Sequence, residues 1–311
     1  MTKPLTPDSF VKDAGGGPGD NQWYGYILAL HDHLVNNGNS TKWNVDQFSD
    51  NASDTAGLTV VPDAAGESFQ VNFRNDTANN DMYMAVDPNS SITDPNDPVG
   101  TGSSEVSPEN SRVGITDPAS RNFHNEILIF EWVDAIGFVS KSDTNRYTPN
   151  WAFGGKIYEP TFANQPNIDF DGLGWHGGQP RSIDNGLGED TNFNRASQLR
   201  TVDGWVTGGT FLSEGSTFPP YNSNNPRDGL GGEPTAELPS TYLVQDDNNN
   251  GAVFGTMKYM HAQHDTGGGL RSIEIVDPGK GPKGWMYMSH DGNSYSLSVP
   301  WDPTVNPTPT N

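Results

Sequence analysis

The spacing of apolar residues constrains the fold of this chain most strongly, because several short segments alternate between apolar and polar positions. The apolar positions of the clearest pair of segments are Phe69, Val71, Phe73, Met82, Met84 and Val86. A period of two residues is that of a β-strand with one buried face, so this pair predicts a β-hairpin. Further strand-like segments are residues 125–133, 135–141, 147–157, 242–245, 252–259, 271–276, 285–289 and 294–299. The sequence therefore predicts a mainly β protein with β-sandwich-like or jelly-roll-like domains.

One segment near the N-terminus has the spacing of an α-helix instead. Its apolar face consists of Trp23, Ile27, Leu30 and Leu34. Asp20 can cap the start of this helix, and the sequence Asn-Asn-Gly at residues 36–38 favours its end. His31 and His33 are two residues apart and would face different sides, so both are predicted to be surface residues. The sequence predicts one short N-terminal helix beside a β-rich body with long irregular loops.

Composition divides the chain into five regions. In order, they are a flexible N-terminal arm at 1–19, the helix with a central β domain at 20–157, a loop-rich interaction region at 158–238, a C-terminal β region at 239–302 and a disordered tail at 303–311. Within the central domain, residues 87–118 are rich in Asp, Asn, Pro, Gly and Ser, which predicts a long loop or insertion.

The region 158–238 contains many aromatic residues but no regular period. The residues predicted as interface anchors are Trp175, Trp205, Phe193, Phe211 and Tyr221. Large apolar side chains that no regular core explains are typical of an interface, where aromatic residues dominate the binding energy. The alternative is that these loops fold back onto the central strands. The first interpretation predicts a surface that packs against a neighbouring molecule.

The charge balance excludes one class of partner. The chain has 17 Lys and Arg residues against 39 Asp and Glu residues, which gives a formal net charge of -22. Because binding to a phosphate backbone needs clustered cations, and the sequence contains no basic patch, nucleic-acid binding is excluded. Self-repulsion of this size is screened in about 1 M salt, where the Debye length is about 3 Å. We therefore expect a protein of a halophile; the alternative is an Asp- and Asn-rich loop protein from a low-salt organism.

The residue content indicates a folded chain without thiol chemistry. The 14 Phe, 10 Tyr and 8 Trp residues can form a core that is poor in aliphatic side chains. Cys is absent from the sequence, which excludes disulfides, Cys-ligated zinc and a thiol nucleophile. The N-terminal residues lack the pattern of a secretory signal. The longest apolar run, residues 127–130, is too short to cross a bilayer. We expect synthesis in the cytoplasm without a signal peptide, and no membrane insertion.

One segment resembles the start of a calcium-binding loop. Asp246, Asn248 and Asn250 precede Gly251, so that oxygen ligands at alternate positions could converge on an ion. The twelfth position of such a loop is Met257, so the closing carboxylate is missing. The alternative is a simple hairpin turn. The three residues are a candidate site for calcium or another cation, and no other cofactor is predicted.

Two further clusters bear on catalysis. His261, His264 and Asp265 could bind zinc if they lay on a helix, but no helical pattern surrounds them, which favours a polar loop. Asp169 and Asp171 could act as the paired carboxylates of a glycosidase, although an acidic loop explains them more simply. The sequence contains neither a nucleophile elbow nor a phosphate-binding loop. It therefore predicts that the protein is not an enzyme.

Three segments carry a resemblance to a known class of protein. They are residues 21–30 (NQWYGYILAL), residues 127–139 (ILIFEWVDAIGFV) and residues 151–158 (WAFGGKIY). This order resembles virion structural proteins of tailed bacterial viruses, in which a short helix with a Trp opens the chain and a hydrophobic strand pair precedes an aromatic, glycine-containing turn. The acidity makes the chain look like a relative from a tailed virus of halophilic archaea.

The resemblance implies a tail or baseplate protein that takes part in assembly or host attachment. It would form a symmetric oligomer in the virion, with copies of itself and other virion proteins as partners, and a host-surface glycan or S-layer as a target. One alternative is a turret or decoration protein of the capsid. The alternative from a different class is a carbohydrate-binding or carbohydrate-active protein of a halophile, which would have a pocket with two close carboxylates.

Overall fold

The structure is a computed structural model of a mainly β chain. The residues that it describes are 8–13, 22–36, 42–51, 55–76, 81–98, 112–113, 126–141, 151–160, 172–178, 197–201, 204–207, 209–212, 242–245, 252–259, 261–264, 273–276, 284–288 and 295–301. Within them the chain forms one N-terminal helix and four antiparallel sheets. The predicted fold class, a sandwich-like, mainly β architecture with one N-terminal helix, is therefore confirmed.

The five-stranded sheet contains the predicted hairpin. Its strands in spatial order are β2 (Trp43–Asn51), β3 (Thr55–Pro62), β4 (Gln70–Asp76), β5 (Asp81–Asp87) and β6 (Arg112–Val113). Phe73 of β4 lies opposite Met84 of β5. The apolar positions predicted for these two strands are buried, because they share the face that packs against the rest of the molecule. The alternation in the sequence is thus confirmed as a hairpin with an apolar inner face.

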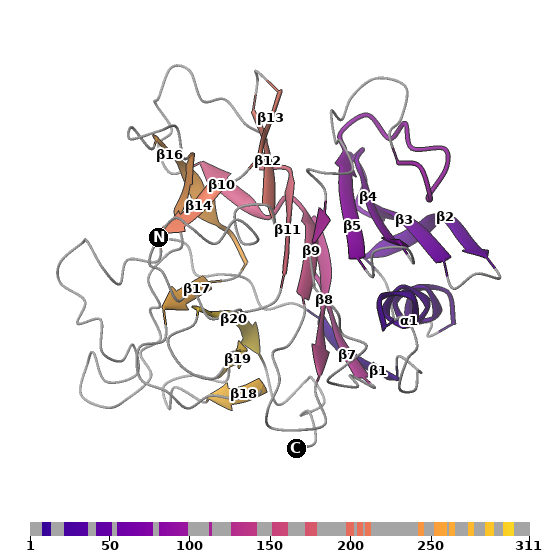
Figure 1. Ribbon diagram of the computed structural model, residues 1–311, viewed down its shortest axis with the longest axis horizontal. Helices are drawn as coiled ribbons and strands as arrows, with labels where there is room; N and C mark the ends of the chain where they lie inside the picture. Colours follow the sequence, from indigo (N-terminus) through magenta and orange to yellow (C-terminus); the bar gives the residue numbers. More distant parts are fainter. Residues whose placement is uncertain are drawn as a thin grey trace.

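The seven-stranded sheet lies in the middle of the molecule (Figure 1). Its strands in spatial order are β1 (Asp8–Asp13), β7 (Glu126–Glu131), β8 (Ala135–Lys141), β9 (Trp151–Gly155), β11 (Gly174–Gly178), β12 (Ser197–Thr201) and β13 (Gly204–Thr207). The five-stranded sheet packs on one face of it, where β4 and β5 approach β9 and β5 also approaches β11. The two sheets share one hydrophobic core.

The seven-stranded sheet is buried on both faces along β7. Ile127 and Ile129 belong to the core shared with the five-stranded sheet, and Leu128 and Phe130 lie on the opposite face, yet all four side chains are buried. A strand that is covered on both faces has a continuous apolar run in place of alternation, which explains the sequence of residues 127–130. On the second face, four rings form an aromatic cluster. Its members are Phe130, Trp132, Phe153 and Tyr259.

The helix α1 (Gln22–Asn36) packs against both of these sheets. It contacts β2, β3 and β4 of the five-stranded sheet and β1 and β7 of the seven-stranded sheet. The rings of Trp23 and Tyr26 lie 6.5 and 5.8 Å from the ring of Phe138 on β8, between centroids. The predicted helix is confirmed: α1 lies beside both sheets (Figure 1), and its apolar side chains belong to the core that the sheets share.

Two four-stranded sheets lie on the other side of the middle sheet (Figure 1). The first has the order β10 (Tyr158–Pro160), β16 (Ala252–Met257), β15 (Tyr242–Gln245) and β14 (Gly209–Leu212). The second has the order β17 (His261–His264), β20 (Tyr295–Trp301), β19 (Gly284–Met288) and β18 (Ile273–Val276). The strands predicted for the C-terminal region correspond closely to β15, β16, β18, β19 and β20.

The structure differs from the prediction at the N-terminus. Residues 8–13, which were expected in a flexible arm, form β1 and pair with β7 in antiparallel register. The charged residues Asp8, Lys12 and Asp13 leave too few apolar positions for a visible alternation. The strand therefore depends on a partner that lies far along the chain, which local pattern does not reveal.

The structure also differs in the region 158–238, which was expected to be loop-rich. Its described residues form five strands: β11, β12 and β13 extend the seven-stranded sheet, and β10 and β14 belong to a four-stranded sheet. Several of these strands contain glycine, for example GWHGG in β11 and GTFL in β14. Because glycine has no side chain, it removes the apolar and polar alternation that identifies a strand in a sequence.

Candidate functional site

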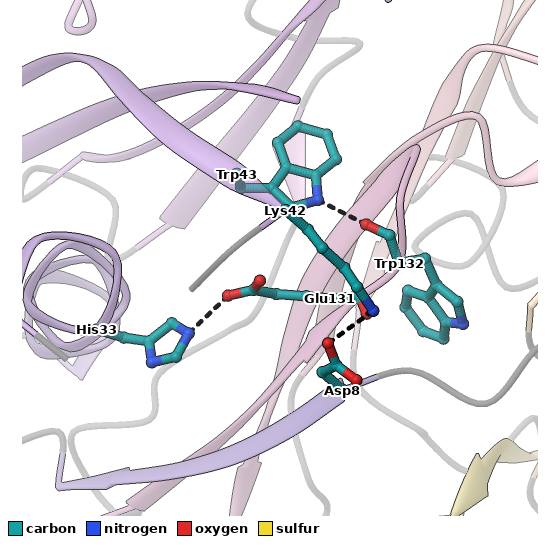
Figure 2. Close-up of polar contacts among 6 residues, drawn as sticks. All are labelled: Asp8, His33, Lys42, Trp43, Glu131 and Trp132. Atoms are coloured by element: carbon teal, nitrogen blue, oxygen red, sulfur yellow. Dashed lines mark hydrogen bonds and ion pairs between the residues drawn. The ribbon is translucent and has the colours of Figure 1, made fainter. Parts of the chain in front are cut away.

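A polar arrangement joins α1 to the strands β1, β2 and β7 (Figure 2). This arrangement, named the junction below, consists of Asp8, His33, Lys42, Trp43, Glu131 and Trp132. These residues come from segments that are widely separated in the sequence, and the junction brings them to the end of β7. Its position suggests that it holds the helix and two sheets in a fixed arrangement.

At the centre of the junction, His33 contacts Glu131 in a site that is closed to solvent. The His33 Nε2 lies 2.6 Å from the Glu131 Oε1, and the two side chains are 0% and 1% exposed. When Glu131 is ionised, its carboxylate accepts the Nε2–H of the imidazole, and such hydrogen bonding is what makes a buried carboxylate tolerable. The ring of Phe10 on β1 lies 4.4 Å from the imidazole, between centroids. The pair thus fixes the last turn of α1 to the end of β7, next to β1.

The start of β2 is tied to the same place. The Trp43 Nε1 donates a hydrogen bond to the Trp132 carbonyl oxygen at 2.8 Å. The Lys42 Nζ donates to the Glu131 carbonyl oxygen at 3.5 Å and forms an ion pair with Asp8 at 2.7 Å. The Asp8 side chain is 47% exposed, so this pair contributes about 0–1 kcal/mol, less than the buried contacts. These contacts connect the start of β2 and the start of β1 to the end of β7.

The turn that follows β7 is held from the opposite side by C-terminal residues. The Asp134 Oδ2 accepts a hydrogen bond from the Lys258 Nζ at 2.6 Å, and the Asp134 Oδ1 accepts one from the Tyr259 hydroxyl. The Tyr259 ring stacks on Trp132 with 4.7 Å between the centroids. The turn at residues 132–134 is therefore the point where the N-terminal and C-terminal parts of the chain are fastened together.

The His33–Glu131 pair at the centre of the junction is placed to join structural elements and not to contact a substrate. An imidazole beside a carboxylate can perform acid–base catalysis, but only where it reaches a substrate. Here both side chains are enclosed by α1, β1 and β7. Among the described residues, no group of three or more His, Cys, Asp or Glu side chains could hold a metal ion. The centre of the junction is therefore a buried, hydrogen-bonded tie between α1 and β7.

A second polar arrangement lies on the outer face of the five-stranded sheet. Residues 88–98, named the covering segment below, cross this face. The Gln70 Oε1 accepts a hydrogen bond from the Ile92 main-chain N–H at 2.8 Å, and the Asn72 Nδ2 donates to the Pro95 carbonyl oxygen at 3.0 Å. A Cβ on Gly57 would lie 2.4 Å from that Pro95 oxygen, so the close approach requires glycine. The polar side chains of the sheet bind the main chain of the covering segment.

The ends of the covering segment are also anchored. The buried Asp87 carboxylate accepts hydrogen bonds from the main-chain N–H groups of Asn89 and Ser91, which turns the chain at the end of β5. At the other end, the Arg74 guanidinium donates to the Asn96 carbonyl oxygen at 3.0 Å. The predicted loop at residues 87–118 is thus docked over its first part. As a result, the polar face of the hairpin is buried instead of solvated.

The structure corrects one predicted interface residue. Trp175 lies on β11 and is fully buried in the core that the two large sheets share, so it is not an interface anchor. For this residue the alternative holds, because the segment packs back onto the central strands. Trp205 lies on β13 and Phe211 on β14, while Phe193 and Tyr221 lie outside the described residues. For these four, an interface role stays a prediction.

The predicted cation ligands Asp246, Asn248 and Asn250 lie outside the described residues. They connect β15 to β16, which pair in antiparallel register, as the hairpin alternative requires. His261 and His264 begin and end the strand β17. Because this segment is a strand and not a helix, the helical zinc site is excluded. Asp169 and Asp171 lie outside the described residues.

The prediction that His33 is a surface residue is wrong, and Glu131 was not singled out at all. Both residues had signals in the sequence. His33 lies three positions after Leu30, on the stripe of α1 that faces the core. Glu131 is the single acidic residue inside the apolar run ILIFEW. A charged residue within such a run indicates a buried carboxylate that needs a partner.

No protein-family model and no curated protein matches the sequence. In the part of the chain that the structure describes, no helix is long and apolar enough to cross a membrane.

Proposed function

We propose that this chain is a structural component of the particle of a tailed virus of halophilic archaea, namely a tail or baseplate protein that acts in assembly and host attachment. The observation that carries the proposal is the junction. Its imidazole, carboxylate and indole groups are buried and fix the end of β7 and the turn after it from one side, while Lys258 holds that turn from the other side. A catalytic protein would place such groups where a substrate can reach them, whereas a structural protein uses them to fix its shape.

The charge of the chain supports the halophilic part of the proposal. A net charge of -22 opposes compaction in dilute buffer and is screened in molar salt. Exposed ion pairs contribute little in such salt, whereas a fully buried pair such as His33–Glu131 is screened much less. The fold therefore has a polar tie in a place where salt affects it little.

A mass-spectrometric inventory of purified particles tests this proposal. We expect the chain to be present in particles of the virus that carries this gene, and to remain with the tail when heads and tails are separated. Recovery with the heads would favour a turret or decoration protein instead. Absence from washed particles would contradict a structural role.

An activity measurement tests the alternative from a different class. The purified chain should leave host-surface glycan intact when the two are incubated in high salt. If it cleaves the glycan, and the double variant Asp169→Asn with Asp171→Asn does not, a carbohydrate-active protein replaces the virion proposal. Unchanged cleavage by that variant would place the activity at other residues.

A further inference from the structure

We infer that β1 is exchanged between copies of this chain, so that β1 of one copy completes the seven-stranded sheet of another. The inference rests on the proposed function, because assembly into a particle is what brings many copies together. It goes beyond that function by naming the strand, the site that receives it and the partner. The partner is a second copy of this chain.

The position of β1 supports exchange. It lies at the edge of the seven-stranded sheet, and among the described strands it pairs with β7 alone. The register runs from Asp8 opposite Glu131 to Asp13 opposite Glu126. The strand is thus a short piece whose main-chain partner lies more than a hundred residues further along the chain.

The site that receives β1 is built without β1. It consists of the edge of β7, the imidazole of His33, which contacts the Phe10 ring, and the ammonium of Lys42, which pairs with Asp8. These groups are held in place by α1, by Glu131 and by the start of β2. A β1 strand from a second copy would make the same contacts. The site selects the sequence of β1 and is indifferent to the chain that supplies it.

The edge of β7 and the outer edge of β1 differ in how readily they accept a further strand. Without β1, the edge of β7 would expose unpaired main-chain groups beside the apolar run at residues 127–130, which is an open template for an incoming strand. By contrast, β1 carries three charged residues among its six, a pattern that discourages addition of a further strand to its outer edge. The pairing is therefore suited to reciprocal exchange and not to open-ended addition.

The sequence of the connector between β1 and α1 also permits exchange. Residues 14–21 contain four glycines and one proline. Glycine imposes little preference on backbone direction, so the sequence of the connector does not commit β1 to its own chain. Because the closed and exchanged forms contain the same contacts, the local concentration of copies decides between them. Assembly raises that concentration.

The absence of Cys in the sequence permits a direct test by disulfide trapping. Asp13 and Glu126 lie opposite each other at one end of the β1–β7 pairing, and opposite residues of an antiparallel pair lie about 4.5–5.5 Å apart between Cα atoms, which suits a disulfide. The test variant is Asp13→Cys with Glu126→Cys. The matched control is Asp76→Cys with Asp81→Cys, which also replaces two opposite acidic residues at the end of a strand pair. The control disulfide closes a hairpin and stays within one chain.

Both full-length variants would be concentrated in high salt, separated by size and oxidised, and the associated fraction would be run on a denaturing gel without reductant. We expect the test variant to give covalent multiples of the 33.7 kDa chain and the control to run as a single chain. Disulfides confined to single chains in the associated test variant would overturn the exchange and leave the proposed function standing, because assembly would then use another surface.

Two other outcomes also count against the inference. A chain that stays monomeric at every concentration overturns the exchange, and the particle inventory decides separately whether the proposed function falls with it. Free thiols in the test variant, when the control is oxidised, would refute the β1–β7 pairing and the exchange that depends on it.

Discussion

The two sides of the turn at residues 132–134 are fastened in different ways. On the side of α1, His33 and Glu131 form a pair that is closed to solvent. On the C-terminal side, Lys258 and Asp134 form a pair whose side chains are 25% and 14% exposed. A buried pair is costly to break, whereas a partly exposed pair is weakened by water and salt. The difference indicates that the charged contact on the C-terminal side is the more open of the two to water and salt.

The replacement Glu131→Ala should have the largest effect. It removes the carboxylate that faces a buried imidazole, and we expect it to lower the free energy of unfolding by about 3–5 kcal/mol. The control Glu131→Gln keeps an oxygen that can accept the Nε2–H of His33, so its loss should be smaller. Urea unfolding in molar salt measures both. Equal, small losses in the two variants would show that the pair is no stronger than the exposed one.

The replacement Trp43→Phe should have an intermediate effect. It removes the indole N–H that binds the Trp132 carbonyl oxygen, at a cost of about 1–3 kcal/mol beyond the lost ring area. Trp23→Phe is the matched control, because Trp23 is equally buried and its indole N–H has no hydrogen-bond partner among the described residues. Thermal unfolding of both variants gives the difference. If Trp23→Phe cost as much, the hydrogen bond at the junction would be unimportant.

The replacement Lys258→Met should have a small effect that depends on salt. We expect a loss of about 0–1 kcal/mol in dilute salt, which decreases as the salt concentration rises. The control Lys258→Arg keeps the positive charge and should lose less. The loss in Glu131→Ala should change little over the same salt series. If the two losses responded equally to salt, the contrast between the two sides of the turn would not hold.

The replacement His31→Phe should have the smallest effect and should reveal itself through pH. Burial lowers the pKa of His31 below its ordinary value of 6.5, against the opposing attraction of the Asp32 and Asp50 carboxylates. The unfolded chain then takes up the proton at a higher pH than the folded chain, so stability is lost as the pH falls below 6.5.

The phenylalanine in this variant keeps a ring to stack on Phe48, which lies 3.6 Å from the His31 ring between centroids, and it does not titrate. The midpoint of thermal unfolding should therefore fall less steeply in the variant than in the natural chain between about pH 7 and about pH 5. Parallel profiles would show that His31 does not contribute to the pH dependence.

The parts of the fold that were predictable are those whose pattern is local. The period of two at Phe73 and Met84 identified the central hairpin, and helical spacing identified α1. The strand β1 escaped prediction because half of its residues are charged, and β11 because its glycines carry no side chains. Both strands owe their conformation to their neighbours in the sheet, and a local pattern does not contain that information.

The junction was not predictable from local pattern at all. His33 and Glu131 are 98 positions apart, and Trp43 and Trp132 are 89 positions apart. Each residue had a weak sign of burial in its own segment, but nothing in either segment identified the other as its partner. The apparent interface residue Trp175 illustrates the opposite error, in which an isolated aromatic residue suggested an exposed surface although it lies in a strand of the core.

The covering segment has a consequence for how this protein can change over generations. Its contacts with the sheet run mainly through main-chain atoms of Ile92, Pro95 and Asn96. The outward side chains of Thr93 and Asp97 are exposed and take no part in those contacts. Substitutions at these two positions should therefore accumulate without altering the path of the chain. The backbone of this surface would then keep its shape while its exposed side chains change. Such a surface suits a protein whose binding partner also changes.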